Sequence, residues 1–352
     1  MVYEISLLQP TVLRGLIERF TAPEELTLLN KVPTTNSPDT TAVWEITRGS
    51  RTIADFNIPN SEANIVDSTG RQAKAASFAY IREKKIFTPT TVKWLRAAGS
   101  SAGARDSAEA AVTRELADLN RRLDNRAEWL LWQALGGKVD INVNGSRNRV
   151  NYEFRDDHYL KPTESWKTAS PINLVKDIRA AKRVIRDHGK VEVTDAYTNE
   201  DTFDYIFDAF VRGGGTNTTP AAPGAYITDS MKQQYYSNGT LPNFMGLNWH
   251  IQGSVFDSTG DAYTDSPKDP YDQEKFLADN KIVFGNFNAN RPIELVQGPS
   301  ADFDAAEGYI GKFTKTWIEP DPASRQALME WHILPVVTQP DQFAVFEDIT
   351  AP

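Results

Sequence analysis

The longest regular pattern of apolar positions lies between Asp106 and Leu135. Apolar residues recur there at steps of three and four, which places them on one face of a helix. They are Val112, Leu116, Leu119, Leu123, Ala127, Leu130 and Ala134. Asp106 or Ser107 can cap the start, and Gly136-Gly137 can end it. At about 1.5 Å per residue the predicted helix is roughly 45 Å long, which is long for a compact domain.

Shorter helical and extended patterns alternate on either side of it. A short amphipathic helix is predicted over residues 10–20, and it is followed by a turn-rich link. Ser170-Pro171 opens a second strong helix. Strand patterns at 191–194 and 247–251 then alternate with two further helical patterns. The sequence therefore predicts a mixed α/β block over residues 171–275.

Residues 41–90 have a different pattern, in which two extended stretches are joined by a polar segment. Residues 42–58 are rich in β-branched and aromatic side chains, and residues 71–87 form a second arm of similar length. This predicts a long two-stranded ribbon without a core of its own. Because such a ribbon is marginally stable in water, we expect it to lie on another subunit. The alternative is a hairpin folded onto its own domain.

The predicted ribbon is slightly basic, whereas the rest of the chain is acidic. The whole chain has a net charge of −9. Residues 42–87 contain seven Lys and Arg and five Asp and Glu, so they carry +2 and leave −11 for the remainder. A basic arm against an acidic body is electrostatically complementary. The acidic balance argues against tight binding of nucleic acid, although solubility alone also accounts for it.

The composition excludes several kinds of chemistry. The chain has 352 residues and no cysteine, so it has no disulfide, thiolate metal site or cysteine nucleophile. It contains no run of 18 apolar residues, and its first residues lack the basic and apolar parts of a secretory signal. We therefore expect no membrane span. The length fits two packed regions rather than one simple core.

One short motif, Asp-Ser-Thr-Gly, is close to a catalytic signature without matching it. It occurs at residues 67–70 and 257–260. Aspartic proteases pair two acids that share a proton, but their glycine stands two places after the acid and here it stands three places after. The tetrapeptide is also a good β-turn. A hydrolase with scattered carboxylates is the alternative from the enzyme class, and we expect no catalytic residue.

The histidines give no clear metal signature. They are His158, His188, His250 and His332, and none lies three or four residues from another. No helix therefore presents a histidine pair to an ion. Asp156-Asp157-His158 is the most metal-like cluster, but a hydrated loop is the simpler interpretation. We expect no metal site and no cofactor.

The order of turn prolines, glycines and tryptophans near the C-terminus is distinctive. Residues 311–317 read Gly-Lys-Phe-Thr-Lys-Thr-Trp, residues 321–325 read Asp-Pro-Ala-Ser-Arg, and residues 334–343 begin with Leu-Pro and end with Pro-Asp-Gln-Phe. Upstream, residues 76–85 read Ala-Ser-Phe-Ala-Tyr-Ile-Arg-Glu-Lys-Lys. These stretches resemble the lambda-type phage major capsid proteins, the capsid protein E family. Ala79 replaces the family's usual proline, and Arg82 replaces a lysine.

The resemblance implies an α+β fold of the Hong Kong 97-like capsid type. It divides the chain into an N-arm with the short helix (1–40), an extended β-ribbon or E-loop (41–95), a peripheral domain (96–170 and 276–352, with a spine helix at 106–135) and an axial domain (171–275).

The same resemblance implies a major capsid protein, not an enzyme. It would self-assemble through pentamers and hexamers into the icosahedral head that encloses phage double-stranded DNA. The ribbon would lie over the adjacent subunit. The candidate interface residues are Trp44, Arg48, Arg51, Phe56, Phe78, Tyr80, Arg82, Lys84 and Lys85. A cellular encapsulin-type shell is the alternative within the same fold.

Several partners follow from the resemblance. We expect a separate scaffolding protein, a portal, and a shell with or without a decoration protein. Contact with the packaged DNA would be weak and non-specific, and no covalent cross-link is expected. The protein would reside in the virion after assembly in the host cytoplasm. Deletion of residues 50–80 is expected to leave a soluble protein that forms no shells.

Overall fold

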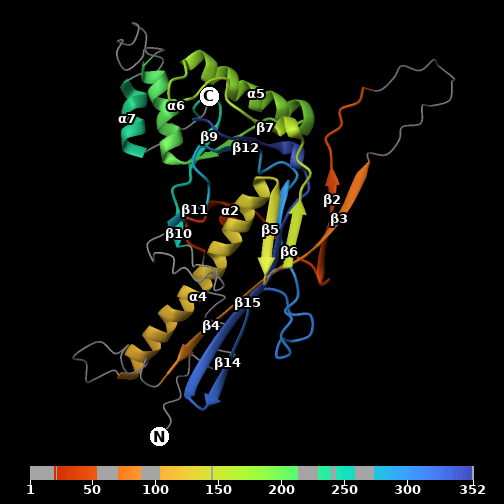
Figure 1. Cartoon of the computed structure of the whole chain (residues 1–352), viewed down its shortest axis with the longest axis vertical. Helices are drawn as coiled ribbons and strands as arrows, with labels where there is room; N and C mark the ends of the chain where they lie inside the picture. The colour runs from red at the N-terminus through yellow and green to blue at the C-terminus, as the bar shows by residue number, and fades with distance from the viewer. Residues whose placement is uncertain are drawn as a thin grey trace, which may run out of the picture.

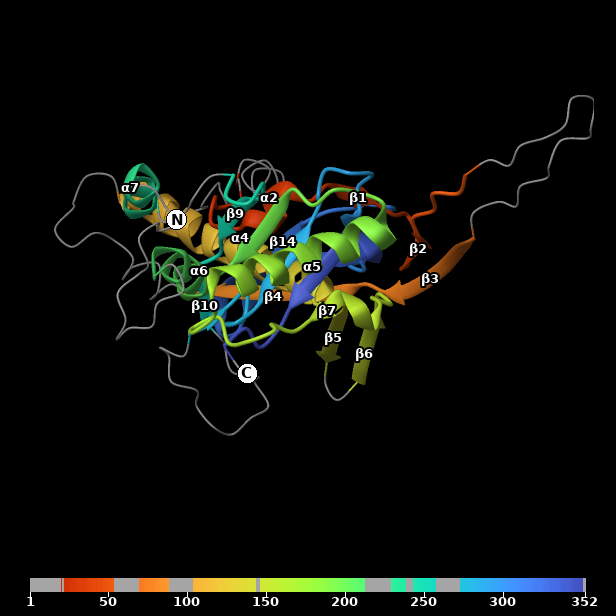
Figure 2. The same cartoon turned by 90° about the horizontal axis from the view of Figure 1, so that it is seen from above.

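The computed structural model describes residues 20, 22–53, 70–88, 104–143, 146–212, 229–238, 243–257 and 273–350. Figure 1 shows a long helix beside a sheet, with a second sheet and further helices above them. A two-stranded limb leaves one side of this body, and Figure 2 shows it pointing away from the rest.

The lower part of the body is a long helix packed on a five-stranded sheet. The helix α4 (Ala104–Leu135) confirms the one predicted from the apolar spacing, and all seven predicted apolar positions are buried. The central strand of the sheet pairs with three others and is antiparallel to each. It is β15 (Ala323–Val337), and its partners are β4 (Ala79–Phe87), β13 (Ile293–Gln297) and β14 (Phe313–Pro320); β1 (Thr34–Asn36) extends the sheet beside β13.

The upper part is a second sheet that is covered on both faces. Its strand order is β7 (Tyr159–Leu160), β16 (Phe343–Phe346), β12 (Ile282–Gly285), β8 (Asp195–Thr198) and β9 (Asn248–Ile251). Phe343 and Val345 join the core around α4, whereas Ala344 and Phe346 join the core under the upper helices. Because successive residues of a strand point to opposite faces, β16 links the two cores.

Three helices surround the upper core, namely α5 (Pro171–Gly189), α6 (Glu200–Arg212) and α7 (Asp229–Asn238). The predicted opening of α5 is confirmed: Ser170 Oγ accepts a hydrogen bond from Asn173 N (3.3 Å), and Pro171 occupies the first turn. The strand predicted at 247–251 corresponds to β9. The strand predicted at 191–194 was placed four residues too early, because the observed strand is β8, at 195–198, and all four of its residues are buried.

Smaller elements complete the body. Within the described residues, β5 (Lys138–Val143) pairs with β6 (Ser146–Asn151), and β10 (Val255–Asp257) pairs with β11 (Gln273–Lys275), each pair antiparallel. Three short helical turns are α2 (Thr27–Lys31), η2 (Asp156–His158) and η3 (Pro340–Gln342). The buried Glu128 of α4 fixes α2 by accepting hydrogen bonds from the backbone N–H groups of Leu28 (3.1 Å) and Leu29 (2.7 Å).

The predicted ribbon is only partly correct. Strand β2 (Thr41–Thr47) pairs antiparallel with β3 (Arg71–Ser77), as expected for its two arms. The prediction that 71–87 forms a single arm is wrong beyond Ser77, because the next strand, β4, pairs with β15 instead. An extended pattern predicts a strand but not its partner, which is a non-local choice. The predicted helix at 10–20, except Phe20, and residues 54–69 lie outside the described residues.

Candidate functional site

The limb, defined as residues 41–53 with residues 70–77, is the most distinctive surface feature. Its strand β2 has two unlike faces. Ala42, Trp44 and Ile46 are buried, and the centroid of the Trp44 ring lies 6.1 Å from the ring centroid of Tyr152 in the body. On the other face Val43 is 61% exposed, and beyond the strand Ile53 is 93% exposed. The limb therefore rests on its own body by one face of β2, and the side chains of Val43 and Ile53 are exposed to solvent.

Ion pairs fix the limb at its root. Arg48 Nη1 lies 2.8 Å from Oδ1 of the buried Asp341, and Arg155 Nε lies 3.2 Å from the same oxygen. Lys74 pairs with Glu153. These contacts connect both strands of the limb to the body. Because the carboxylate of Asp341 is buried, removing its cationic partners would cost more than breaking a surface pair, since a buried charge would be left uncompensated.

Backbone contacts add to this root. Thr47 N donates to the carbonyl oxygen of Thr338 (2.9 Å), and Arg51 Nη2 donates to that of Lys190 (2.6 Å). A Cβ on Gly49 would stand 2.7 Å from the carbonyl oxygen of His188 and 3.0 Å from that of Gly189. The chain therefore passes the end of α5 so closely that only glycine fits there.

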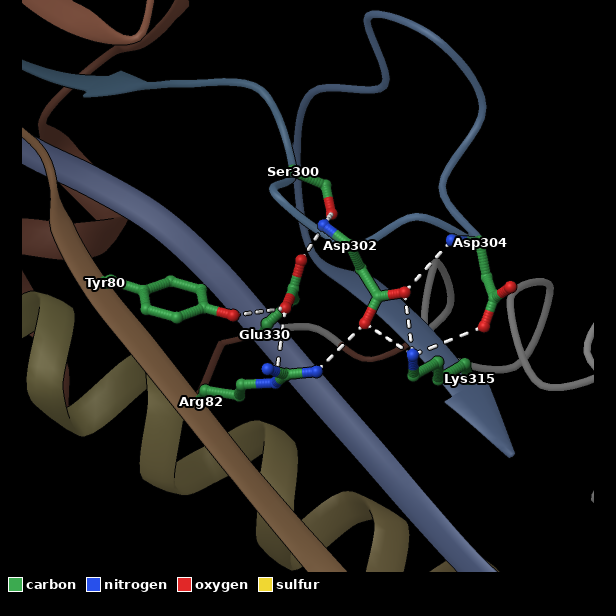
Figure 3. A network of polar contacts seen from close by, with 7 residues as sticks. All are labelled: Tyr80, Arg82, Ser300, Asp302, Asp304, Lys315 and Glu330. Carbon is green, nitrogen blue, oxygen red and sulfur yellow. Dashed lines mark hydrogen bonds and ion pairs between the residues drawn. The ribbon is translucent and has the colours of Figure 1, made fainter. Parts of the chain in front are cut away.

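Beyond the limb, a polar network holds β4 to β15 and β14, and Figure 3 shows its members converging over the sheet. Glu330 of β15 accepts hydrogen bonds from Tyr80 Oη (2.8 Å) and from Ser300 Oγ. Arg82 Nη2 lies 2.9 Å from Asp302 Oδ2, and Lys315 Nζ lies 2.6 Å from the same oxygen. The network thus joins three strands and the loop that contains Ser300 and Asp302.

The protonation states of Tyr80 and Asp302 are set by burial and by the charged groups next to them. Glu330 is 1% exposed. Burial raises the pKa of Tyr80 to about 12, helped by the hydrogen bond and the charge of Glu330. Burial alone would raise the pKa of Asp302, but the hydrogen bond from Lys315 and the charges of Lys315 and Arg82 hold that pKa below its usual value. Asp302 is therefore held as a carboxylate.

The opposite face of β4 is tied to α4. Lys85 pairs with Glu115 and Asp118, and Arg122 Nε lies 2.9 Å from Glu83 Oε2. Burial alone would lower the pKa of Lys85, but its hydrogen bonds to the two carboxylates outweigh burial and raise the pKa. Both faces of β4 are thus joined to the body by charged groups.

The predicted interface residues divide into groups. Trp44, Arg48 and Arg51 lie at the limb root, while Tyr80, Arg82 and Lys85 belong to the contacts of β4. Lys84 Nζ donates to Gln326 Oε1 at 3.3 Å, and Phe78 packs over Gly298, where a Cβ would come within 2.5 Å of its ring. Phe56 lies outside the described residues. Their role between subunits stays a prediction.

Two exposed apolar residues of the limb, Val43 and Ile53, were missed by the sequence reasoning. The signal was present in the alternation of β2, where Val43 and Trp44 must point to opposite faces. Trp44 was predicted as an interface residue because of its large aromatic ring, but that ring faces the body of the same chain.

The other sites considered from the sequence are the two Asp-Ser-Thr-Gly motifs and the histidines. Of the two Asp-Ser-Thr-Gly motifs, only Gly70 and Asp257 belong to the described residues. Within the described residues, Asp157, His158 and His188 form a group of side chains that could share an ion. The spacing of histidines along the chain could not indicate this group, because it joins η2 to the end of α5. Among the described helices, none is both long and apolar enough to cross a membrane.

Comparison with known proteins connects this architecture to a family. Residues 27–345 match the family model of phage major capsid protein E. No curated protein shows significant similarity to the chain. The fold is similar to the crystal structure of the putative capsid protein of a prophage from E. coli CFT073, with 15% identity, a TM-score of 0.63 and coverage of 97% of this chain and 99% of that chain.

A second similar structure is a phage-related protein from Bordetella bronchiseptica RB50, with 12% identity, a TM-score of 0.53 and coverage of 97% of both chains. The predicted α+β class with a Hong Kong 97-like capsid fold is confirmed. Since the family match covers residues 27–345 of the 352, the chain belongs to the phage major capsid protein E family.

Proposed function

We propose that this phage major capsid protein assembles through pentamers and hexamers into an icosahedral head around double-stranded DNA. The observation that carries the proposal is the limb, which is rooted by ion pairs yet exposes apolar side chains away from the body. The exposed side chains of Val43 and Ile53 gain stability when a neighbouring copy covers them. Subunits that each present a different patch to the next form closed rings.

We assign the parts of the chain to the parts of such a subunit. The N-arm is 1–40, the E-loop is 41–95, the peripheral domain is 96–170 with 276–352, and the axial domain is 171–275. The sheet against α4 supports the peripheral assignment, and the sheet under α5 and α6 supports the axial one. By its pairing β4 belongs with the peripheral sheet, so the projecting part of the E-loop ends at Ser77.

The limb would contact the adjacent subunit through its outward face. Val43 and Ile53 are the apolar contacts we propose there. Arg51 and Arg71 are exposed cations of the same limb, and Arg71 pairs with Glu45 (3.0 Å). The acidic remainder of the chain supplies a surface of complementary charge. Trp44, Arg48, Phe78, Tyr80, Arg82, Lys84 and Lys85 would act by setting the direction of the limb.

The remaining partners follow from the family. A separate scaffolding protein and a portal would take part in assembly in the host cytoplasm, and the shell would form with or without a decoration protein. The net charge of −9 supports weak, non-specific contact with the packaged DNA. Family and fold are those of a structural protein, so we propose a structural role rather than the hydrolase alternative.

The experiment that tests this function shortens the limb without touching the sheet. Residues 54–69 would be replaced by a six-residue Gly-Ser linker, and the exposed Val43 and Ile53 of the limb would be replaced by serine. A deletion reaching residue 80 is avoided, because it would remove the buried Ala79 and the start of β4. The variant is expected to keep the unfolding transition of the wild type. Electron microscopy of both proteins, each co-expressed with the scaffold, should show shells only for the wild type. Normal shells from the shortened protein would refute the role of the limb.

A further inference from the structure

We propose that Asp157, His158 and His188 form a binding site for a divalent transition-metal ion, with Zn²⁺ as the best fit. The inference goes beyond assembly and concerns the single folded chain. The three residues come from two elements, η2 and the last turn of α5, which meet beside the limb root.

The ligand atoms already stand near the separation that a shared ion requires. His158 Nε2 lies 3.0 Å from His188 Nδ1, which lies 3.5 Å from Asp157 Oδ2. All three ligand atoms lie within 4.8 Å of one another. Ligands bound tetrahedrally at about 2.0–2.1 Å are separated from each other by roughly 3.3 Å. Small rotations of the side chains would therefore complete three of four coordination positions.

The orientation of His158 is that of a metal ligand. The ring is fully buried, and its Nδ1 lies 2.6 Å from the carbonyl oxygen of Phe343. Since a carbonyl oxygen can only accept, Nδ1 carries the proton and Nε2 presents its lone pair toward His188. Ligating histidines commonly donate their other ring N–H to a carbonyl in this way, which fixes the tautomer and the ring.

The group of ligands is open to solvent on one side and lies at the C-terminal end of α5. The His188 side chain is 27% exposed and that of Asp157 is 53% exposed, so solvent reaches one side of the group and can supply a fourth ligand. The end of a helix also presents carbonyl oxygens, which attract positive charge. Nearby Asp341 is buried, and its Oδ2 has no hydrogen-bond partner among the described residues, while Arg48 and Arg155 pair with its Oδ1. An ion here would join η2 to α5 beside Gly49.

The test uses the full chain after treatment with EDTA, titrated with ZnCl2 and separately with CoCl2 by calorimetry and visible absorption. We expect one ion per chain, a tetrahedral Co²⁺ spectrum, and a rise in the unfolding temperature with Zn²⁺. His188→Ala should abolish the Co²⁺ spectrum, and Asp157→Asn should weaken Zn²⁺ binding at least tenfold. These two side chains are partly exposed, so their replacement is compatible with folding, unlike that of the buried His158.

Two matched controls isolate the site. Asp156→Asn changes the neighbouring acid of the same helical turn, and His250→Ala removes a histidine from another part of the sheet. Both variants should bind Zn²⁺ as the wild type does. Absence of stoichiometric binding to the wild type, or equal binding by the His188→Ala and Asp157→Asn variants, would overturn the proposal. Because shell formation is not measured, the result is independent of the limb experiment.

Discussion

At the scale of single residues, the buried carboxylate of Glu330 holds together side chains from a neighbouring strand and from a loop. Glu330 accepts from Tyr80 and Ser300 and lies 3.5 Å from Arg82 Nε, so groups from a strand and a loop depend on it. The sequence indicated that Tyr80 and Arg82 matter, because they stand in a recognisable segment. It could not indicate Glu330, which lies 250 residues from Tyr80 and meets it only through β-pairing.

Replacing Glu330 should therefore be costly. Glu330→Ala removes the acceptor of two hydrogen bonds and the partner of Arg82, and we expect the free energy of unfolding to fall by about 3 kcal/mol. Urea unfolding followed by fluorescence measures the change. Glu307→Ala, at an exposed acid in the neighbouring loop, is the control and should change stability by less than about 0.5 kcal/mol. Equal free energies of unfolding for the two variants would show that the contacts of Glu330 do not stabilise the fold.

Because the pKa of Asp302 is lowered in the folded chain, the stability of the protein should depend on pH in the acidic range. A carboxyl group whose pKa is lower in the folded than in the unfolded chain stabilises the fold at pH values above its unfolded pKa of about 3.9. That contribution is lost as the pH falls through the folded pKa. Asp302→Asn should therefore destabilise the protein at pH 7 and progressively less below about pH 4. Thermal unfolding across this range measures it, and a pH-independent difference would count against the ion pairs.

At the scale of elements, α4 and β4 illustrate what a sequence can specify. The helix was predicted because its apolar spacing is a local property, and every predicted apolar position is buried. The extended pattern of residues 71–87 was recognised too, but the change of partner at Phe78 was not. Nothing local distinguishes pairing with β2 from pairing with β15. The contact of His158 with His188 was missed for the same reason, since 30 residues separate them.

The root of the limb offers a prediction at this scale. Gly49→Ala would place a methyl group 2.7 Å from the His188 carbonyl oxygen, and backbone must move to admit it. We expect a loss of about 1–3 kcal/mol and faster hydrogen exchange of the Thr47 amide, which bonds to Thr338. Gly70→Ala is the matched change in the same limb, because a Cβ there meets nothing within 4 Å. Similar exchange in both variants would show that the limb is not seated on α5.

At the scale of the whole molecule, the family and fold could be predicted from short stretches at residues 76–85 and 311–343. These stretches contribute to β4, β14 and β15, three strands of one five-stranded sheet. Their order is informative because each must fit the others. The surfaces through which copies meet could not be predicted in the same way, since the most prominent side chains of the limb, such as Trp44, are used within the chain.

The direct passage from β3 into β4 has a mechanical consequence. Only Phe78 stands between the two strands, and Figure 1 shows the chain running from the limb along the sheet. A neighbour that pulls on the limb therefore loads β4 along its axis. The nine residue pairs from Ala79–Ile333 to Phe87–Arg325 then resist together in shear rather than opening one by one. In the assembly proposed above, tension on the limb would thus pass into the sheet and the long helix of the same subunit.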